Sequence, residues 1–403
     1  MNHNSHEVTH DDAPPAQLGK LQSAAMLVGG LLFLAFFGMV GTSSDAVRVE
    51  LMQSYIYGFM CAVSISLGML GLTLLHHTVR GSWGLSVIRL AEAGASARTF
   101  MLLALLYVPI IFFYKDLYPW ANAATVAGDH VLRNKAAWMN PTAVAIRAFV
   151  LIGIWGLLAN GLRKSSIRQD ESNDENEAQT RTNWAAPGIV LLALTVTVAV
   201  TDWVMSLDPH WYSTMFGPLF IVGPGLGALA LCSLLIGVNA NRDPFKNYIR
   251  PNVTKDLGNM MLTFTMLWAY FNFSQFLIIW NGNLPTTAGY YYARSVEGWN
   301  AVGCALIVGQ FFIPFVWLLC PSTKRHPMNL ARVAGWLLVM RIVDIYYIVT
   351  PMYRTTGPMP HLADGIAFLS LMGLWTMVFC AQIKKASIYP MHDRRLLEAT
   401  DHA

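Results

Sequence analysis

Residues 213–239 read STMFGPLFIVGPGLGALALCSLLIGVN, a run without a single Asp, Glu, Lys or Arg. An α-helix needs about 20 consecutive apolar residues to cross the hydrocarbon core of a bilayer, and this run is long enough. Segments in lipid must satisfy their backbone hydrogen bonds internally or in a closed barrel, and the run lacks the alternating hydrophobicity of barrel strands. It therefore predicts a membrane-spanning helix.

Nine other runs have the same character, in a chain of 403 residues that is 55% hydrophobic and only 12% charged. This composition, with charges gathered between long apolar stretches, is typical of membrane proteins. We expect an all-α integral membrane protein with about ten transmembrane helices. The other nine are expected at 24–40, 55–75, 99–114, 141–162, 185–205, 257–280, 298–320, 332–350 and 362–383.

The remaining segments are polar. Residues 1–22 lack the basic region and cleavage site of a signal peptide, so they predict a flexible tail. Residues 163–184 are acidic and predict a disordered linker between the first four helices, within 23–162, and the last six, within 185–383. Residues 384–403 are expected to form a second tail.

Lysine and arginine residues are unevenly distributed between the two sides of this arrangement. An even number of helices puts both termini on one side, and nineteen of the 27 Lys and Arg residues fall on that side, against six on the other. Cytoplasmic loops of membrane proteins carry the excess of positive charge. We therefore predict that both tails and the acidic linker are cytoplasmic.

Ionisable residues within the predicted helices are the first candidates for function. Arg147 and Asp202 lie near the outer ends of their helices. Arg341 and Asp344 share a helix face at i, i+3 spacing. An unpaired charge at these depths is costly, so we expect the four to be paired or hydrated. Such residues often belong to ion, proton or substrate paths, and an Arg–Asp pair that only fixes helix register is the alternative.

A short outer connection adds two candidates. Residues 201–214, TDWVMSLDPHWYST, place two carboxylates and an imidazole among amphipathic aromatics. An interfacial aromatic belt with polar helix caps is the plainer interpretation. The proposed proton-transfer groups are Asp202, Asp208, His210 and Asp344, with Arg147 and Arg341 as charge partners. On the cytoplasmic half of the predicted helices, only hydroxyls, amides and sulfurs are candidates for relaying protons. A complete proton path would therefore need water there.

Two helices have features that suit a cavity. Gly223-Pro224-Gly225 lies near the middle of the helix at 213–239, and broken helices at this depth occur at transporter binding sites. A proline kink is the commoner explanation. The helix at 257–280 carries a polar and aromatic stripe, which suits a cavity or close helix packing. Candidates for lining a cavity or quinone site are Trp211, Tyr212, Tyr270 and Gln275.

The sequence lacks the motifs by which this chain would itself bind a cofactor. No histidine pair lies inside the predicted helices, as a membrane b-haem would require, and the five cysteines form no iron–sulfur or haem-c motif. No nucleotide-binding motif occurs. We expect a chain that binds no metal or haem, has no catalytic residues of its own and has no nucleic-acid partner.

Four segments resemble one family. The run 201–217, TDWVMSLDPHWYSTMFG, is similar to the pattern in the second NrfD-like (polysulfide-reductase-like) membrane subunit of alternative complex III. The other three segments agree in the expected order across most of the chain. They are LYPW at 117–120, WAYFNFSQF at 268–276 and RIVDIYY at 341–347.

The resemblance implies two four-helix bundles, formed by the second to fifth and the sixth to ninth helices and flanked by the first and tenth. It implies a cofactor-free subunit of a respiratory quinol:cytochrome c oxidoreductase in the bacterial inner membrane, with a role in proton translocation and a quinone or quinol as a further ligand. The implied partners are a sister NrfD-like subunit, an iron–sulfur subunit and multihaem cytochrome c subunits, which hold the iron–sulfur clusters and haem c. A secondary transporter and a purely structural membrane anchor are the competing functions.

Overall fold

The computed structural model describes residues 17–174, 176–390 and 393. These residues form helices and short connections, with no strand among them. Ten segments of this part are long and apolar enough to cross a membrane, which confirms the all-α membrane fold. They are α1 (Gln17–Thr42), α2 (Asp45–Val79), α3 (Ile88–Gly94) with α4 (Ala97–Phe112), α8 (Pro141–Ser172), α9 (Asn176–Trp203), α10 (Phe216–Asn239), α12 (Pro251–Gly282), α14 (Trp299–Leu306) with α15 (Ile313–Leu319), α17 (Pro327–Val349) and α18 (Leu362–Ile383).

Short helices connect these spans. The π-helical turn η4 (Ile307–Phe312) joins α14 to α15 within one span. The others are η1 (Ser82–Ser86), α5 (Tyr114–Leu117), η2 (Pro119–Ala121), α6 (Ala123–Gly128), α7 (His130–Lys135), η3 (Met205–Leu207), α11 (Phe245–Tyr248), α13 (Pro285–Ala293), α16 (Pro321–Arg325) and η5 (Thr350–Met352).

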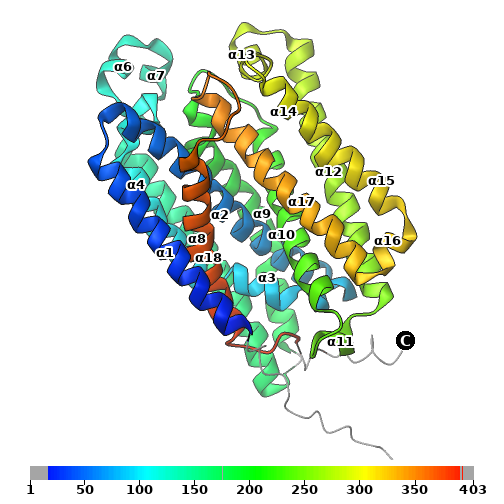
Figure 1. Ribbon diagram of the computed structural model, residues 1–403. Coiled ribbons are helices and arrows are strands. Elements are labelled where there is room, and N and C mark those ends of the chain that lie inside the picture. The colour runs from blue at the N-terminus through cyan, green and yellow to red at the C-terminus, as the bar shows by residue number, and fades with distance from the viewer. Residues whose placement is uncertain (1–16, 175, 391–392, 394–403) are drawn as a thin grey trace, which may run out of the picture.

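The spanning helices form two four-helix bundles, as expected. In the first bundle α2, α4, α8 and α9 pack in a closed ring, and in the second α10, α12, α14–α15 and α17 do the same. The bundles meet where α2 packs against α10. The tenth span, α18, lies against α2, and α1 covers α18 on its outer side (Figure 1).

The junction of the two bundles depends on a glycine. A Cβ on Gly68 of α2 would overlap the carbonyl group of Pro224 in α10. Small residues allow this close approach of two backbones between membrane helices. In the apolar stretch of α2, 89% of the residues are buried, against 17% in α1, so α2 is the core helix of the molecule.

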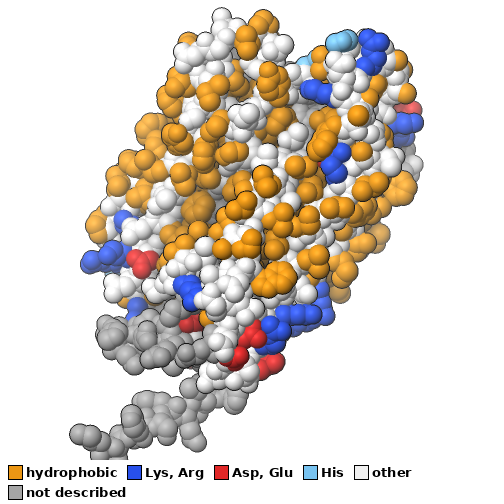
Figure 2. Space-filling model, turned by 180° about the vertical axis from the view of Figure 1, so that it is seen from behind, with side chains coloured by type: hydrophobic (Ala, Val, Ile, Leu, Met, Phe, Trp, Pro, Cys, Tyr) orange, Lys and Arg blue, Asp and Glu red, His pale blue; other side chains and the backbone are white. Residues whose placement is uncertain are grey.

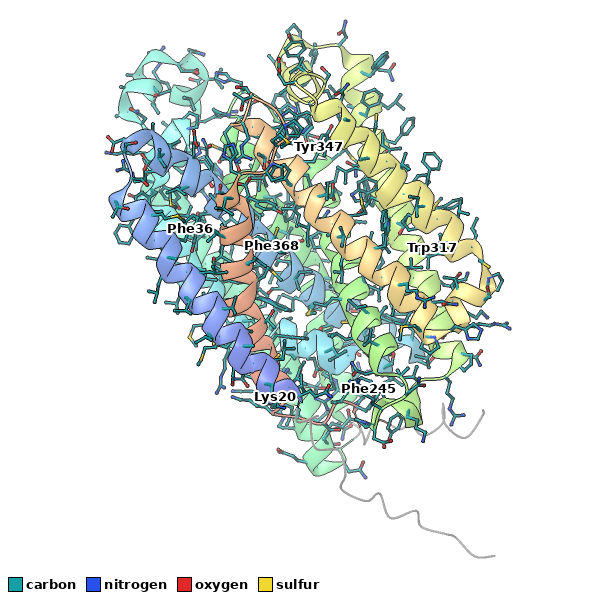
Figure 3. All side chains as sticks on the ribbon, viewed as in Figure 1. Lys20, Phe36, Phe245, Trp317, Tyr347 and Phe368 are labelled. Atoms are coloured by element: carbon teal, nitrogen blue, oxygen red, sulfur yellow. The ribbon has the colours of Figure 1, made fainter. Side chains whose placement is uncertain are left out.

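The two ends of the molecule differ. At the end that we call the terminal side, the start of α1 meets the end of α18, where Lys384 donates a hydrogen bond to Gln22 (2.7 Å). The opposite end, the distal side, carries α5, α6, α7 and α13 (Figure 1). Figure 3 places Lys20 and Phe245 at the terminal side and Tyr347 at the distal side. Apolar side chains cover the surface between the two ends, where lipid is expected (Figure 2).

The acidic segment 163–184 is helical, because α8 and α9 extend through it and leave only a short connection. Two of its carboxylates are paired: Glu177 accepts a hydrogen bond from Arg168 (2.9 Å), and Asp170 pairs with Arg89. This pairing lets the two helices continue beyond the apolar region. The expectation of a disordered linker is therefore wrong.

The predicted tails fall largely outside the described residues. Residues 17–22 are helical and belong to α1, so the predicted tail boundary at residue 22 is wrong. Residues 384–390 form turns and bends. The predictions for residues 1–16, 391–392 and 394–403 lie outside the part of the chain that the structure describes.

The helix predicted at residues 213–239 is continuous. α10 runs through Pro224 without interruption from Phe216 to Asn239. The break considered at residues 223–225 is therefore wrong, and Gly223 instead makes room for a side chain of α17, described below.

Candidate functional site

An ion pair between the half-buried Arg147 and the buried Asp202 joins α8 to α9 near the distal side. Arg147 binds the Asp202 carboxylate with two nitrogens, Nε at 2.7 Å and Nη2 at 3.1 Å. Trp138 Nε1 donates to the same carboxylate (3.1 Å), and the Arg147 guanidinium lies 4.1 Å from the centre of the Trp138 ring. Asp202 is 1% exposed. Two-fold hydrogen bonding of this kind offsets the cost of burying both charges, and the expected pairing is confirmed.

The position of Arg147 follows from the start of its helix. Pro141 occupies the first turn of α8, and the Asn140 side chain caps the helix by accepting a hydrogen bond from Ala143 N (2.9 Å). Arg147 lies six residues further on, which is about 9 Å at 1.5 Å per residue. Its side chain thereby reaches Asp202 in the last turn of α9.

A second buried pair lies within α17. Arg341 donates to Asp344 one turn later, and Trp268 of α12 donates to the same carboxylate (3.0 Å). Both charged residues are 2% exposed. In the described part of the chain no hydrogen bond or ion pair connects them to the Arg147–Asp202 pair, which belongs to the other bundle.

The glycines of α10 make room for Arg341. A Cβ on Gly223 would lie 2.6 Å from Arg341 Cζ, and a Cβ on Gly227 would lie 3.2 Å from Arg341 Cγ. These two glycines are four residues apart, so they share one face of α10. Gly223 and Gly227 therefore accommodate the buried arginine side chain of the neighbouring helix, whereas a Cβ on Gly225 would meet Phe264 (2.7 Å).

Arg341 is only partly satisfied by the protein. Its Nη1 binds Asp344, but Nε and Nη2 have no hydrogen-bond partner among the described residues. Leaving charged donors unsatisfied in an apolar interior is costly. We expect ordered water at these nitrogens, because buried water usually serves otherwise unsatisfied polar groups.

A third ion pair lies at the distal side and was missed by the sequence analysis. Arg354 binds Asp364 through two nitrogens (2.8 and 3.2 Å), and Ser54 of α2 donates to Asp364 (2.6 Å). Burial acts to lower the pKa of Arg354, but the hydrogen bond to Asp364 and its charge raise that pKa above its usual value. The sequence signal was weak: Asp364 stands three residues after His361, the spacing of a helix cap, and it forms a capping box there.

The terminal side holds a fourth cluster, which we call the Glu92 cluster: His77, Arg89, Glu92 and Asp170. His77 Nε2 lies 3.5 Å from Glu92 Oε1, and Arg89 donates to Glu92 (3.1 Å) and pairs with Asp170. His77, Arg89 and Glu92 are at most 5% exposed. The prediction that this half offers only hydroxyls, amides and sulfurs is therefore wrong.

This cluster was not predicted, because residues 76–98 fall between the helices expected at 55–75 and 99–114. They contain α3, a buried seven-residue helix at the start of the third span. The usable signal was the Arg89–Glu92 spacing of i, i+3 among apolar neighbours, which places opposite charges on one helix face.

Core helix α2 connects the two sides of the molecule. Cys61 lies within electrostatic range of Arg341, and His77 is in the Glu92 cluster. These two residues are sixteen positions apart, about 24 Å along the helix. The buried side chains between them include Ser64 and Ser66, and Ser66 accepts a hydrogen bond from Trp375 (2.8 Å). Ser64 Oγ has no partner among the described residues.

Asp208 and His210 lie at the distal surface and do not touch Asp202. His210 Nε2 contacts Asp129 Oδ2 (2.7 Å), and Asp208 accepts a hydrogen bond from the backbone of His210 (3.2 Å). Asp129 also caps α7 by accepting from Val131 N (2.7 Å). Partial burial acts to raise the pKa of Asp129, but these backbone hydrogen bonds and His210 bring it below its usual value.

The four aromatic and amide candidates do not surround one ligand-sized space. Trp211 and Tyr212 line a distal cavity of ≈ 220 Å³ beside Trp138 and Ser206, whereas Tyr270 and Gln275 are not among its lining residues. Tyr270 is 62% exposed. Gln275 is bonded to Ser213 (2.9 Å) and Tyr291 (3.3 Å), and Trp211 stacks on Tyr290 with ring centres 4.1 Å apart.

Comparison with known protein families and with curated proteins gives no match for this chain. Within the described residues, no group of three or more His, Cys, Asp or Glu side chains has the arrangement of a metal site.

Proposed function

We propose that this chain is a proton-conducting, cofactor-free membrane subunit of a respiratory quinol:cytochrome c oxidoreductase. Two things support the proposal: the resemblance of residues 201–217 and three other segments to a subunit of alternative complex III, and the buried ionisable groups of both bundles. In this proposal the chain is not catalytic alone. Iron–sulfur and multihaem cytochrome c subunits carry the electrons, and a sister NrfD-like subunit completes the membrane part.

The observation that carries proton conduction is the Arg341–Asp344 pair. A pair that only fixed helix register is expected to use its hydrogen-bonding groups on protein partners, because unsatisfied groups are costly away from water. Arg341 instead leaves Nε and Nη2 without protein partners in the described part of the chain. Ionisable residues inside a membrane span are typical of proton and ion paths, and the open nitrogens of Arg341 offer a place for water beside Asp344.

The proposed direction of proton transfer across the membrane follows from the distribution of positive charge. The terminal side carries most of the Lys and Arg residues, which favours its placement in the cytoplasm of a bacterium. Protons then enter at the Glu92 cluster, where the His77 imidazole lies beside the Glu92 carboxylate. The path then needs water along α2 for about 24 Å, where Ser64 offers a buried hydroxyl without a partner in the described chain. In this proposal Asp344 and Asp202 continue the proton path through the outer half of the membrane. Asp208 and His210 lie at the outer surface, where protons leave.

The test compares Asp344→Asn with Asp45→Asn, whose side chain is 90% exposed at the distal side. Each variant is purified as the assembled complex and reconstituted in proteoliposomes. We expect Asp344→Asn to keep uncoupled electron transfer while proton translocation falls at least several-fold, and Asp45→Asn to behave as the unmodified complex. Normal assembly with normal proton translocation in Asp344→Asn would refute conduction through this residue.

The partner assignment has its own test. Purification of the chain in mild detergent is expected to bring haem-c and iron–sulfur proteins with it. A lone, colourless chain that transports a solute would support a transporter instead. Loss of assembly in Asp344→Asn without any separate effect on protons would support a structural anchor. The continuous helix α10 removes the feature that had favoured a transporter.

A further inference from the structure

The segment that follows α18 lies across the terminal side of the molecule. The chain turns at Lys384 and Lys385 and then runs toward α11 as residues 386–390, which we call the C-terminal strap (Figure 1). The strap is irregular, yet Ile388 is only 4% exposed and Tyr389 only 1%. Irregular segments near a chain end are seldom buried unless something holds them in place. The strap is therefore packed against the protein by apolar contacts.

The strap lies directly on the Glu92 cluster. Residues 386–388 line a cleft together with Arg89 and Leu90 of α3 and Arg163 of α8. The cleft has a volume of only ≈ 10 Å³, which is room for one water at most. Arg89 is an ion-pair partner of Glu92 (3.1 Å). The strap thus closes one side of the cluster against bulk water.

The two ends of the strap are held in different ways. Its start is fixed, because Arg163 donates a hydrogen bond to the carbonyl of Gln382 in the last turn of α18 (2.7 Å). Its far end is held by aromatic contacts with α11, where the centre of the Tyr389 ring lies 4.4 Å from that of Tyr248 and 6.0 Å from that of Phe245. Since α11 connects α10 to α12, Tyr389 fastens the strap to the second bundle.

Hydrogen bonds do not tie the strap to other segments of the described chain. Those that it makes are local: Tyr389 N donates to Ser387 Oγ (3.4 Å), and Pro390 O accepts from Asp393 N (3.0 Å). The Tyr389 hydroxyl has no hydrogen-bond partner in the same part of the chain, so its ring alone makes the contact with α11. Segments with few hydrogen bonds to their surroundings are the ones that open locally at low free energy.

From these contacts we infer that the C-terminal strap is a detachable cover of the Glu92 cluster, hinged at the end of α18 and latched by Tyr389 on α11. While the latch is closed, Arg89 and Leu90 are sealed beneath the strap. When it opens, bulk water reaches Arg89 and, beside it, the Glu92 carboxylate. The cover itself is independent of the proposed function. Its consequence, that the strap controls proton uptake from the terminal side, rests on the proposed function.

The experiment measures the access of a reagent to the surface beneath the strap. Leu90 is 4% exposed, so Leu90→Cys places a thiol in the covered cleft. The full-length chain in mild detergent is treated with a water-soluble maleimide, and labelled peptides are quantified by mass spectrometry. The exposed Cys320 is the internal reference. We expect the thiol of Leu90→Cys to react much more slowly than Cys320, because a covered group reacts only while the cover is open.

Substitutions at the latch then open the cover. In the Leu90→Cys chain, Tyr389→Ala should speed labelling about tenfold or more, the order expected when a buried aromatic contact is lost. Tyr389→Phe is the matched control, because it keeps the ring and removes only the unpartnered hydroxyl. A chain that ends at Lys385 lacks the strap and should react fastest. A chain that ends at Asp393 keeps the strap and should react slowly.

Proton uptake is measured with the same variants in proteoliposomes that contain the assembled complex, and Tyr389→Ala should take up protons faster than Tyr389→Phe. Faster labelling with unchanged uptake would support the cover and refute proton entry at the Glu92 cluster. Equal labelling rates in Tyr389→Ala and Tyr389→Phe would overturn the cover, and so would a Leu90→Cys thiol that reacts as fast as Cys320. If the chain that ends at Lys385 does not fold, the two Tyr389 variants still decide the question.

Discussion

Gly223 of α10 lies directly against Arg341 of α17, so that a Cβ at residue 223 would come within 2.6 Å of the Arg341 Cζ atom. This contact explains a glycine within an apolar helix, because the space of its missing side chain is filled by the guanidinium. The ion pair with Asp344 thus depends on a residue of another helix.

We predict that Gly223→Ala displaces Arg341 and destabilises the protein by about 1–3 kcal/mol, the usual cost of overpacking a core. The measurement is thermal unfolding in detergent. Gly153→Ala in α8 is the matched control, because a Cβ there meets no atom within 4 Å in the described chain. Gly153→Ala should be neutral or slightly stabilising. Equal stability of the two variants would contradict the account of Gly223.

The Arg147–Asp202 pair predicts a strong coupling between its two residues. Arg147→Gln should cost roughly 3–5 kcal/mol, because it leaves the buried Asp202 carboxylate unpaired. Asp202→Asn should cost less, because the Arg147 side chain is 20% exposed and water can reach it. The double variant should cost clearly less than the sum of the two. Unfolding of all three variants gives the coupling, and additive costs would show that the pair contributes no mutual stabilisation.

The Glu92 cluster predicts a defect in proton uptake from the terminal side. Glu92→Gln removes the carboxylate beside His77, whereas Asp170 remains paired with Arg89. Proteoliposomes with the assembled complex should show slower proton uptake and unchanged uncoupled electron transfer. Glu171→Gln, an exposed residue on the same side, serves as the control. Unaltered uptake in Glu92→Gln would place the proton entry elsewhere.

Asp129 predicts a pH dependence of the distal loop. Its pKa is lowered in the folded protein, so its contribution to stability is present above the unfolded pKa of about 3.9 and is lost as pH falls through the folded value. Limited proteolysis of residues 123–140 should therefore show the unmodified protein better protected than Asp129→Asn at pH 6. The difference should shrink as the pH falls below the unfolded pKa of about 3.9. A difference that grows on acidification would reverse the assigned sign.

The number of spans could be predicted from the sequence because length and hydrophobicity alone decide whether a helix crosses a bilayer. The depth of Arg147 could be predicted too, since the rise per residue is fixed. The Glu92 cluster could not, because it is assembled from α2, α3 and α8, whose relative placement no local pattern encodes. The helical linker was missed for a similar reason: composition reports charge but not the partner that neutralises it.

The unequal burial of the helices has a consequence for biogenesis. Core helix α2 packs against α10 and α18, which are made much later during synthesis. When the first five spans have left the ribosome, the face of α2 that will meet α10 and α18 is still open to lipid. Ser54 on this face has no acceptor until Asp364 of the last helix is inserted. The packing of the N-terminal half is therefore incomplete until the tenth helix is inserted. A chain that stops before residue 362 would expose this polar seam to the bilayer and become a substrate for membrane quality-control proteases.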